Sequence, residues 1–194
     1  MFFLVRHAAH ELVDRVLCGR MPGVSLGEEG RSQARRVAER LARERIAAVH
    51  TSSLERARET AAPIAERLRL APEVHEALNE IALGEWAGRS FEDLSQDPRW
   101  QSWNSARAVS RPPGGESMLE VQARAVGHLE RARAAHPDQA VVLVSHADVI
   151  KAALLYFLGM PIDGYRLFDI SPASISTLVI GDWGAKVLSM NEVP

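Results

Sequence analysis

Histidine and arginine residues follow directly after short apolar runs in this sequence. The runs are residues 2–5, 46–49 and 141–144. Arg6 and His7 follow the first run, His146 follows the third, and Arg56 lies in the first turn of the helical pattern after the second. In an open α/β sheet, ligands bind beyond the carboxyl ends of the strands. Two imidazoles and two guanidiniums are expected to meet there, beside a helix N-terminus. Such a set suits a doubly charged tetrahedral anion, for example a phosphoryl group.

The elements that must position these residues also follow from the pattern. Short continuous apolar runs, each followed by polar residues and then a helical pattern, are typical of buried parallel strands. Apolar residues at helical spacing predict amphipathic helices over residues 27–45, 54–68 and 117–136. Ser52 and Glu55 form a capping-box pattern at the start of the second helix. The last quarter predicts strands over residues 166–170, 174–180 and 186–190, with the last two as an edge hairpin. We therefore expect an α/β three-layer sandwich, with a mostly parallel central sheet flanked by helices.

Residues 79–116 do not follow this alternation of strands and helices. The stretch holds several glycines, a Pro-Pro pair at 112–113 and three of the four tryptophans, Trp86, Trp100 and Trp103. Long connections in compact domains are usually lids or binding segments. We expect a small cap insertion here, within a single domain that spans residues 1–194.

The composition excludes several classes of protein. Hydrophobic residues make up 46% and charged residues 25%, as in ordinary folded domains. The net charge of −2 provides no positive field for a nucleic acid or an anionic membrane. A single cysteine, Cys18, cannot form an internal disulfide, which favours the reducing cytoplasm. The apolar start, residues 1–5, is too short for a signal peptide or a membrane span. The oligomeric state stays open, and a homodimer is compatible with the sequence.

Four short motifs occur along the chain in a recognisable order. They are residues 3–7 (FLVRH), 52–61 (SSLERARETA), 78–88 (LNEIALGEWAG) and 144–150 (VSHADVI). In this order and at these separations they resemble the motifs of the histidine phosphatase superfamily, which has the phosphoglycerate-mutase-like fold. Residues 113–117 (PGGES) are also similar to a segment that precedes a helix in that family. The resemblance covers most of the chain.

The resemblance implies a role for each of the residues that follow the strands. His7 would be the nucleophile and Glu80 the general acid, while the phosphoryl oxygens would be held by Arg6, Arg56 and His146. A neutral imidazole attacks phosphorus well and leaves well, and fixed guanidiniums stabilise the charge on the transferring group. A carboxyl group near Trp86 could have its pKa raised enough to supply a proton. The implied reaction is hydrolysis of a small-molecule phosphomonoester through a phosphohistidine, with no metal and no cofactor.

The chain departs from the family pattern beside these residues. Ala8 and Ala147 stand where glycine is usual, although their backbone N–H groups remain donors. His10 and Val13 replace polar side chains, so contacts with the substrate must differ from those of the family. Arg20 lies in a loop that the family uses near its pocket. Its side chain could contact the substrate, or Arg20 could be only a turn residue, and the sequence favours neither role over the other. We expect His10, Arg20 and Ala147 near the substrate, whose identity the sequence does not reveal.

Three alternatives use the same residues. A phosphoglycerate-type mutase would keep its phosphoryl group from water, and a non-catalytic module would bind the group without needing the proton donor Glu80. A zinc protein would use His7, His10 and His146, but two arginines aimed at the same place would repel the cation. The other histidines are interpreted as structural: His50, His75, His128 and His136.

Overall fold

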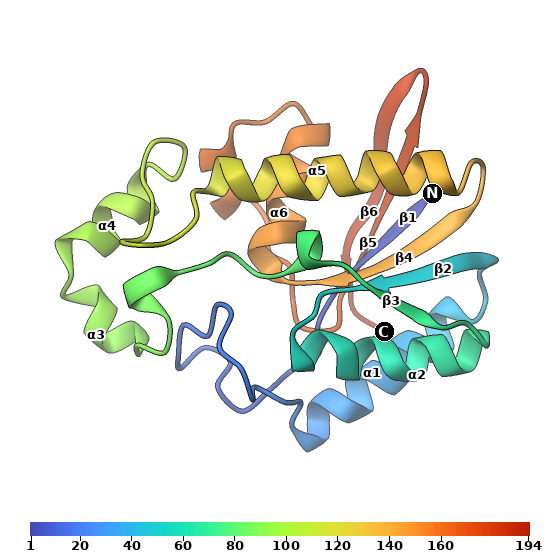
Figure 1. Ribbon diagram of the computed structural model, residues 1–194, viewed down its shortest axis with the longest axis horizontal. Coiled ribbons are helices and arrows are strands. Elements are labelled where there is room, and N and C mark those ends of the chain that lie inside the picture. Colours follow the sequence, from blue (N-terminus) through green and yellow to red (C-terminus); the bar gives the residue numbers. More distant parts are fainter.

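One six-stranded mixed sheet forms the centre of the protein in the computed structural model, which describes residues 1–194 (Figure 1). The strand order is β3-β2-β4-β1-β5-β6. Parallel pairing joins β1 (Phe2–Arg6), β2 (Ile46–Thr51), β3 (Pro72–Val74) and β4 (Ala140–Ser145). Antiparallel pairing adds β5 (Ile175–Gly181) and β6 (Gly184–Glu192). The carboxyl ends of β1, β2 and β4 therefore meet at one edge.

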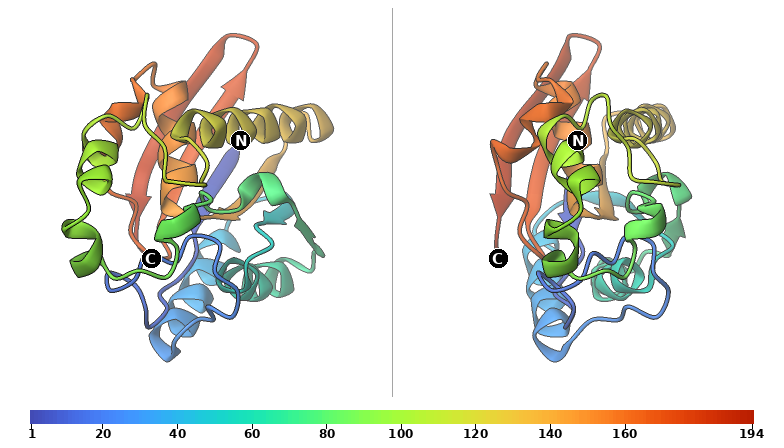
Figure 2. Two further views of the ribbon diagram at one scale, coloured as in Figure 1. Left: turned by 60° about the vertical axis from the view of Figure 1, so that its left-hand side comes forward. Right: turned by 90° about the vertical axis from the view of Figure 1, so that its left-hand side faces the viewer.

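Both faces of the sheet are covered by helices. Successive side chains of a strand point to opposite faces. Phe3 and Val5 accordingly pack with α1 (Glu28–Leu41) and α2 (Glu55–Leu68), whereas Phe2 and Leu4 pack with α5 (Met118–Ala135) and α6 (Ala147–Phe157). Figures 1 and 2 show the sheet between these two helical layers. The predicted three-layer fold with a mostly parallel sheet is confirmed.

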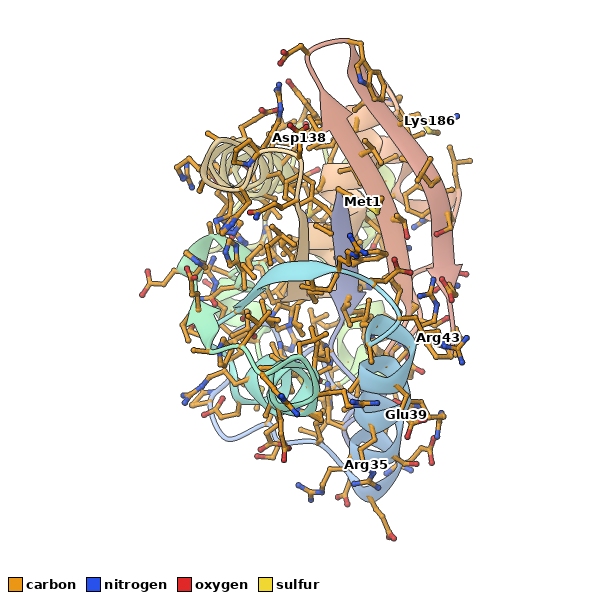
Figure 3. The ribbon with its side chains drawn as sticks, turned by 90° about the vertical axis from the view of Figure 1, so that its right-hand side faces the viewer. Met1, Arg35, Glu39, Arg43, Asp138 and Lys186 are labelled. Carbon is orange, nitrogen blue, oxygen red and sulfur yellow. The ribbon has the colours of Figure 1, made fainter.

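The outer surface of α1 is charged, and the edge strand β6 also carries an exposed charge. Figure 3 labels Arg35 and Glu39 of α1 and Arg43 in the turn that follows it, and all three are exposed. Lys186 is exposed on β6, where a charge opposes pairing with a further strand. The predicted edge hairpin is present, because β5 and β6 pair antiparallel at this edge of the sheet. None of the helices combines the length and the apolar character that crossing a membrane needs.

Two local predictions are wrong. Residues 166–170 form no strand, because β5 already occupies the place beside β1. Arg166 instead ends η3 (Ile162–Arg166), a short 3₁₀ helix whose Ile162 and Tyr165 are buried in the same core as α6, and residues 167–170 follow it. The capping box is absent as well: α2 begins after Leu54 with no side-chain cap, since Ser52 points its hydroxyl at other partners. The short edge strand β3 was not predicted.

Residues 79–116 contain short helices and no strand. These helices are η2 (Gly84–Trp86), α3 (Phe91–Ser95) and α4 (Pro98–Ser105). The rings of the three tryptophans of this segment contact one another, with Trp86 and Trp103 almost fully buried. The Arg107 guanidinium lies between the rings of Trp103 and Tyr165, and its Nη1 donates to Asp148 Oδ1 at 2.8 Å. These contacts attach the segment to α6 and η3.

Candidate active site

A cavity of about 150 Å³ lies beyond the carboxyl end of β1. Its walls come from the loop after β1, from α2, from residues 79–116 and from the start of α6. The candidate residues that line it are Arg6, His7, His10, Arg56, Glu80 and Ala147. His146 lies beside His7, with 5.0 Å between the ring centroids. The structure therefore brings together all of the candidates except Arg20.

His7 is buried and held in one orientation by two contacts. Its Nδ1 lies 2.9 Å from the Ala8 carbonyl oxygen, and its Nε2 lies 3.3 Å from Arg56 Nε. Because a carbonyl oxygen only accepts, Nδ1 carries the hydrogen and Nε2 keeps its lone pair. Burial, reinforced by Arg56 and Arg6, lowers the pKa of His7 well below its usual value. The ring is therefore neutral at pH 7, and Nε2 carries the lone pair that could act as a nucleophile.

Each of the two arginines donates a short hydrogen bond to a backbone carbonyl oxygen. Arg6 Nη1 donates to the carbonyl oxygen of Ile170 at 2.6 Å, and Arg56 Nη2 donates to that of Gly19 at 2.6 Å. Arg6 Nε and Arg56 Nη1 are buried with no hydrogen-bond partner. Buried charges in proteins are normally paired, and no carboxylate bonds either guanidinium here. The two side chains form a rigid cationic cradle that suits an anion.

His146 joins the cavity to a polar chain beyond β2. Its Nε2 lies 2.8 Å from Ser52 Oγ, which in turn lies 2.9 Å from Asn79 Oδ1. Its Nδ1 is buried without a partner. Burial, followed by the effects of His7 and Arg56, lowers the pKa of His146 well below its usual value. The single hydroxyl hydrogen of Ser52 can be directed at Asn79 Oδ1 or at His146 Nε2. When it is directed at Nε2, the neutral His146 ring carries its hydrogen on Nδ1 and can donate it to a bound anion.

Sequence reasoning missed the part played by Ser52 and Asn79. Asn79 Oδ1 accepts a hydrogen bond from the backbone N–H of Ser53 and also from the Ser52 hydroxyl when that hydrogen is directed at it. Both residues were nevertheless adjacent to recognisable signals. Ser52 stands directly beyond β2, at the sheet edge where ligands bind, and Asn79 precedes Glu80 in the third motif.

Glu80 follows η1 (Glu76–Leu78) and faces the cavity. Its Oε1 accepts a hydrogen bond from the backbone N–H of Ile81 at 2.9 Å. Burial, with a further contribution from the Asp148 carboxylate, raises the pKa of Glu80 to about 7. Both the protonated and the ionised form are then populated near neutral pH. This is the behaviour expected of a group that first donates a proton and later removes one.

Arg20 holds the Glu80 loop from outside the cavity. Its Nε donates to the backbone carbonyl oxygen of Glu80 at 2.6 Å, and its Nη2 lies 3.0 Å from Glu116 Oε2. Glu116 also pairs with Arg124 of α5, at 2.7 Å. Arg20 therefore contacts the backbone that carries Glu80 and does not line the cavity.

His10 and the backbone around the cavity complete the site. The His10 ring stacks on His7 with centroids 5.4 Å apart, and burial lowers its pKa to about 4. The backbone N–H of Ala8 donates to Thr60 Oγ1 at 2.9 Å, so it is already used within the protein. Ala147 is the first residue of α6, where N–H groups have no acceptor inside the helix. The helix start can therefore donate to a ligand where the alanine replaces glycine.

The zinc alternative at His7, His10 and His146 gains nothing from this geometry. Both ring nitrogens of His7 already have partners, and the two guanidiniums repel a cation. The histidines whose ring nitrogens do approach one another at ligand distance are three of those interpreted as structural: His50, His75 and His128.

Comparison with known proteins assigns the family. The family model described as "Histidine phosphatase superfamily (branch 1)" matches residues 2–193. The chain belongs to this superfamily. The expectation drawn from the four motifs is therefore confirmed at the level of the family.

Members of the family similar to this chain include named phosphatases. Phosphoserine phosphatase 1 of Hydrogenobacter thermophilus is 31% identical over 193 residues, which cover 97% of this chain and 90% of that protein. Glucosyl-3-phosphoglycerate phosphatase of Mycobacterium tuberculosis is 32% identical over 187 residues, covering 90% and 83%. A solved structure of the mycobacterial glucosyl-3-phosphoglycerate phosphatase with VO3 has a TM-score of 0.89 at 27% identity, and 98% of each chain is covered.

Proposed function

We propose that this histidine phosphatase is a metal-independent phosphomonoesterase that hydrolyses a small organic phosphate through a phosphohistidine at His7. One observation carries the proposal: four buried nitrogens, three on residues that line the cavity and one on His146 beside it, have no partner within the protein. They are Arg6 Nε, His10 Nδ1, Arg56 Nη1 and His146 Nδ1. Buried polar groups are normally hydrogen-bonded, and the three oxygens of a phosphoryl group would satisfy such donors.

The first step forms a bond between His7 Nε2 and phosphorus and breaks the bond from phosphorus to the ester oxygen. Arg56 exchanges its contact with Nε2 for a phosphoryl oxygen. Arg6, Arg56 and His146 then stabilise the charge that spreads over the three oxygens. Glu80 donates its proton to the leaving alkoxide.

The second step reverses the role of Glu80. Its carboxylate removes a proton from a water molecule, whose oxygen attacks phosphorus. The bond between phosphorus and Nε2 breaks, which restores His7 and releases inorganic phosphate. The raised pKa of Glu80 supports this cycle, because the same group must lose and regain a proton near neutral pH.

The walls of the cavity favour a compact substrate. Val13 and Phe91 are apolar lining residues, and Asp14 and Asp148 supply carboxylates beyond the phosphoryl cradle. Residues 79–116 contribute Glu80, Leu83 and Phe91, and we propose that this segment acts as a cap that sets selectivity. The names of the relatives point to phosphoserine and to a phosphorylated sugar acid, which are two substrates for a first screen.

Hydrolysis is favoured over mutase activity by the side chains that line the cavity. A mutase must hold the intermediate sugar acid while it turns around. Val13 lines the cavity and offers no hydrogen bond to such a carboxylate. Supplying 3-phosphoglycerate with a bisphosphoglycerate primer distinguishes the two activities, and we expect phosphate release to exceed isomerisation. Isomerisation that is faster by orders of magnitude would overturn this assignment.

Rapid quench with ³²P-labelled p-nitrophenyl phosphate tests the covalent step. We expect an acid-labile, base-stable phosphoenzyme that is labelled on His7, together with steady release of phosphate. His7→Ala should lose both, while the matched variant His136→Ala, outside the cavity, should keep both. Label on His146, or full activity in His7→Ala, would refute the role of His7. Binding of phosphate without any turnover would instead support the non-catalytic module.

A further inference from the structure

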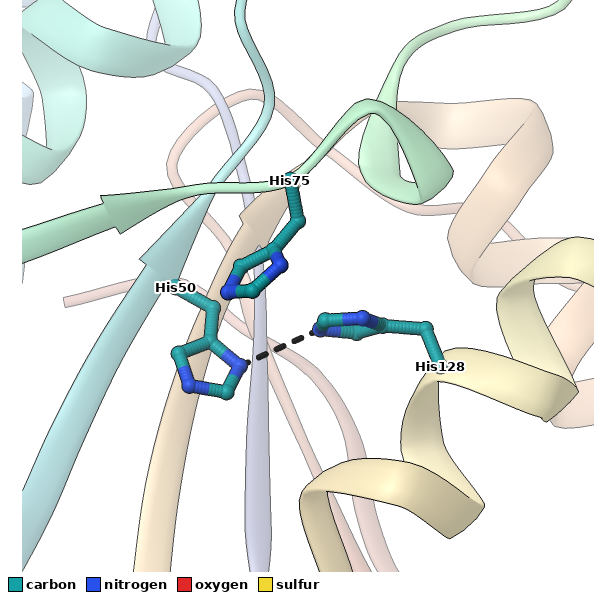
Figure 4. Close-up of side chains that lie close together, drawn as sticks. All are labelled: His50, His75 and His128. Atoms are coloured by element: carbon teal, nitrogen blue, oxygen red, sulfur yellow. Dashed lines mark hydrogen bonds between the residues drawn. The ribbon is translucent and has the colours of Figure 1, made fainter. Parts of the chain in front are cut away.

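Three histidines outside the catalytic cavity converge between the sheet and α5 (Figure 4). His50 comes from β2, His75 follows β3 and His128 comes from the middle of α5. Each can offer a nitrogen such that the three nitrogens all lie within 4.8 Å of one another. The ring centroids of His50 and His75 are 4.5 Å apart, as are those of His75 and His128. None of the three rings takes part in the phosphatase site described above.

The distances are close to those of a tetrahedral metal site. Zinc binds imidazole nitrogen at about 2.0–2.1 Å, so two ligands of one tetrahedral ion lie about 3.3 Å apart. His50 Nδ1 and His128 Nε2 are separated by 3.1 Å, the contact drawn as a dashed line in Figure 4. The third nitrogen, on His75, lies within 4.8 Å of the other two, so the His75 ring must move closer to them when it binds the same ion.

The hydrogen bonding of the cluster is incomplete in the protein alone. A single hydrogen bond, between His50 and His128, joins the rings. His50 Nε2 and His75 Nε2 are buried without a partner. The His50 side chain is only 5% exposed, so water does not compensate for the missing bond. Interior imidazoles that serve only to support the fold are normally hydrogen-bonded.

A carboxylate stands beside the cluster. Glu73 Oε2 of β3 lies 3.5 Å from His75 Nε2 and 3.8 Å from His50 Nε2. Histidines that bind a metal through one nitrogen commonly donate the other N–H to a carboxylate. If His50 binds through Nδ1, its Nε2–H is directed to Glu73 in this way. The Glu73 side chain is 57% exposed, which leaves a path for an ion from solvent.

Two of the three rings, those of His50 and His128, are also suited to a cation by their charge state. Burial, with the other histidines of the cluster as further causes, lowers the pKa of His50 to about 4 and that of His128 to about 3. Both rings are therefore neutral at pH 7, as a metal ligand must be. A set of imidazole ligands favours zinc and its transition-metal neighbours over magnesium and calcium, which prefer oxygen.

We propose that His50, His75 and His128 form a binding site for a Zn²⁺-type transition-metal ion. Water takes the fourth position, as in other sites with three protein ligands, and Glu73 acts as the outer carboxylate. The ion would join β2, β3 and α5. It would also restrain the segment from His75 to Glu80, because His75 stands five residues before the proposed acid. The role of this ion is binding and stabilisation, and no step of the phosphatase reaction depends on it.

Cobalt and zinc titrations of the purified full chain test the site. After treatment with a chelator and dialysis, we expect one Co²⁺ per chain with the visible absorption of tetrahedral coordination, displaced by one equivalent of Zn²⁺. Zn²⁺ should also raise the Tm. His75→Gln should weaken binding by more than about 100-fold, beyond the 10–100-fold that loss of an outer carboxylate typically costs. Glu73→Gln should fall within that smaller range.

Matched variants locate the ion and guard against misfolding. His136→Gln changes a nearby histidine, with its ring centroid 5.8 Å from that of His50, and should bind zinc as the parent does. His10→Gln should also retain binding, which separates this site from the catalytic cavity. Because His75 is half-buried, its variant is expected to fold, and circular dichroism checks this. The proposal is overturned if the folded parent binds no stoichiometric zinc, or if His75→Gln and His128→Gln bind it as tightly as the parent.

Discussion

Replacing Glu80 by glutamine should remove a specific pH dependence from the stability of this protein. The carboxyl group has an ordinary pKa of 4.5, and burial near Asp148 raises its pKa to about 7 in the folded state. Between these values the folded protein binds more protons than the unfolded chain. The free energy of unfolding therefore falls as the pH rises through this window. Glutamine stays neutral at every pH and has no such dependence.

The size of the effect follows from the same two values. The gap between 4.5 and about 7 corresponds to a loss of about 3 kcal/mol, since one pKa unit is worth 1.36 kcal/mol. Relative to Glu80→Gln, the parent should lose about 3 kcal/mol of its free energy of unfolding between pH 4 and pH 8. This is a large share of the 5–15 kcal/mol that is typical of folded domains.

Urea unfolding at a series of pH values measures the difference. The free energy of unfolding is obtained by linear extrapolation for the parent, for Glu80→Gln and for the control Glu39→Gln. Glu39 is exposed on α1 (Figure 3), so its variant should follow the parent at every pH. If the parent and Glu80→Gln show the same dependence on pH, Glu80 ionises as an ordinary carboxyl group. Its proposed role as a proton donor at neutral pH would then fail.

Three kinetic predictions accompany this one. Glu80→Gln should lower kcat most for alkyl phosphates and least for p-nitrophenyl phosphate, whereas equal losses across leaving groups would indicate a structural role for Glu80. In the parent, kcat for alkyl phosphates should fall above about pH 7 as Glu80 ionises. Arg56→Lys should reduce kcat by about 100-fold or more, because one ammonium cannot replace a planar group that contacts both His7 and Gly19; an unchanged rate places Arg56 outside the reaction. Vanadate should inhibit, whereas excess EDTA should leave turnover intact; a loss with EDTA that magnesium restores contradicts metal independence.

The sequence alone determined the layers of the fold and the edge at which the candidate site lies. The apolar runs before His7 and His146 are local signals, and parallel strands bring their carboxyl ends to one edge wherever the helices lie. Arg56 follows from the same logic, because the start of α2 is tied to the end of β2 by a short connection. The order of the four motifs was enough to predict the family.

Tertiary structure alone decided contacts between segments that are far apart in the chain. Ser52 looks like a helix cap in sequence, yet it bonds His146, 94 residues away, and Asn79. Residues 166–170 carry a strand pattern, but β4 and β5 already occupy the two positions beside β1. His50 and His128 meet across 78 residues, because α5 crosses the sheet face on which His50 lies. Spacing describes only local periodicity, whereas these contacts depend on how strands and helices are placed in space.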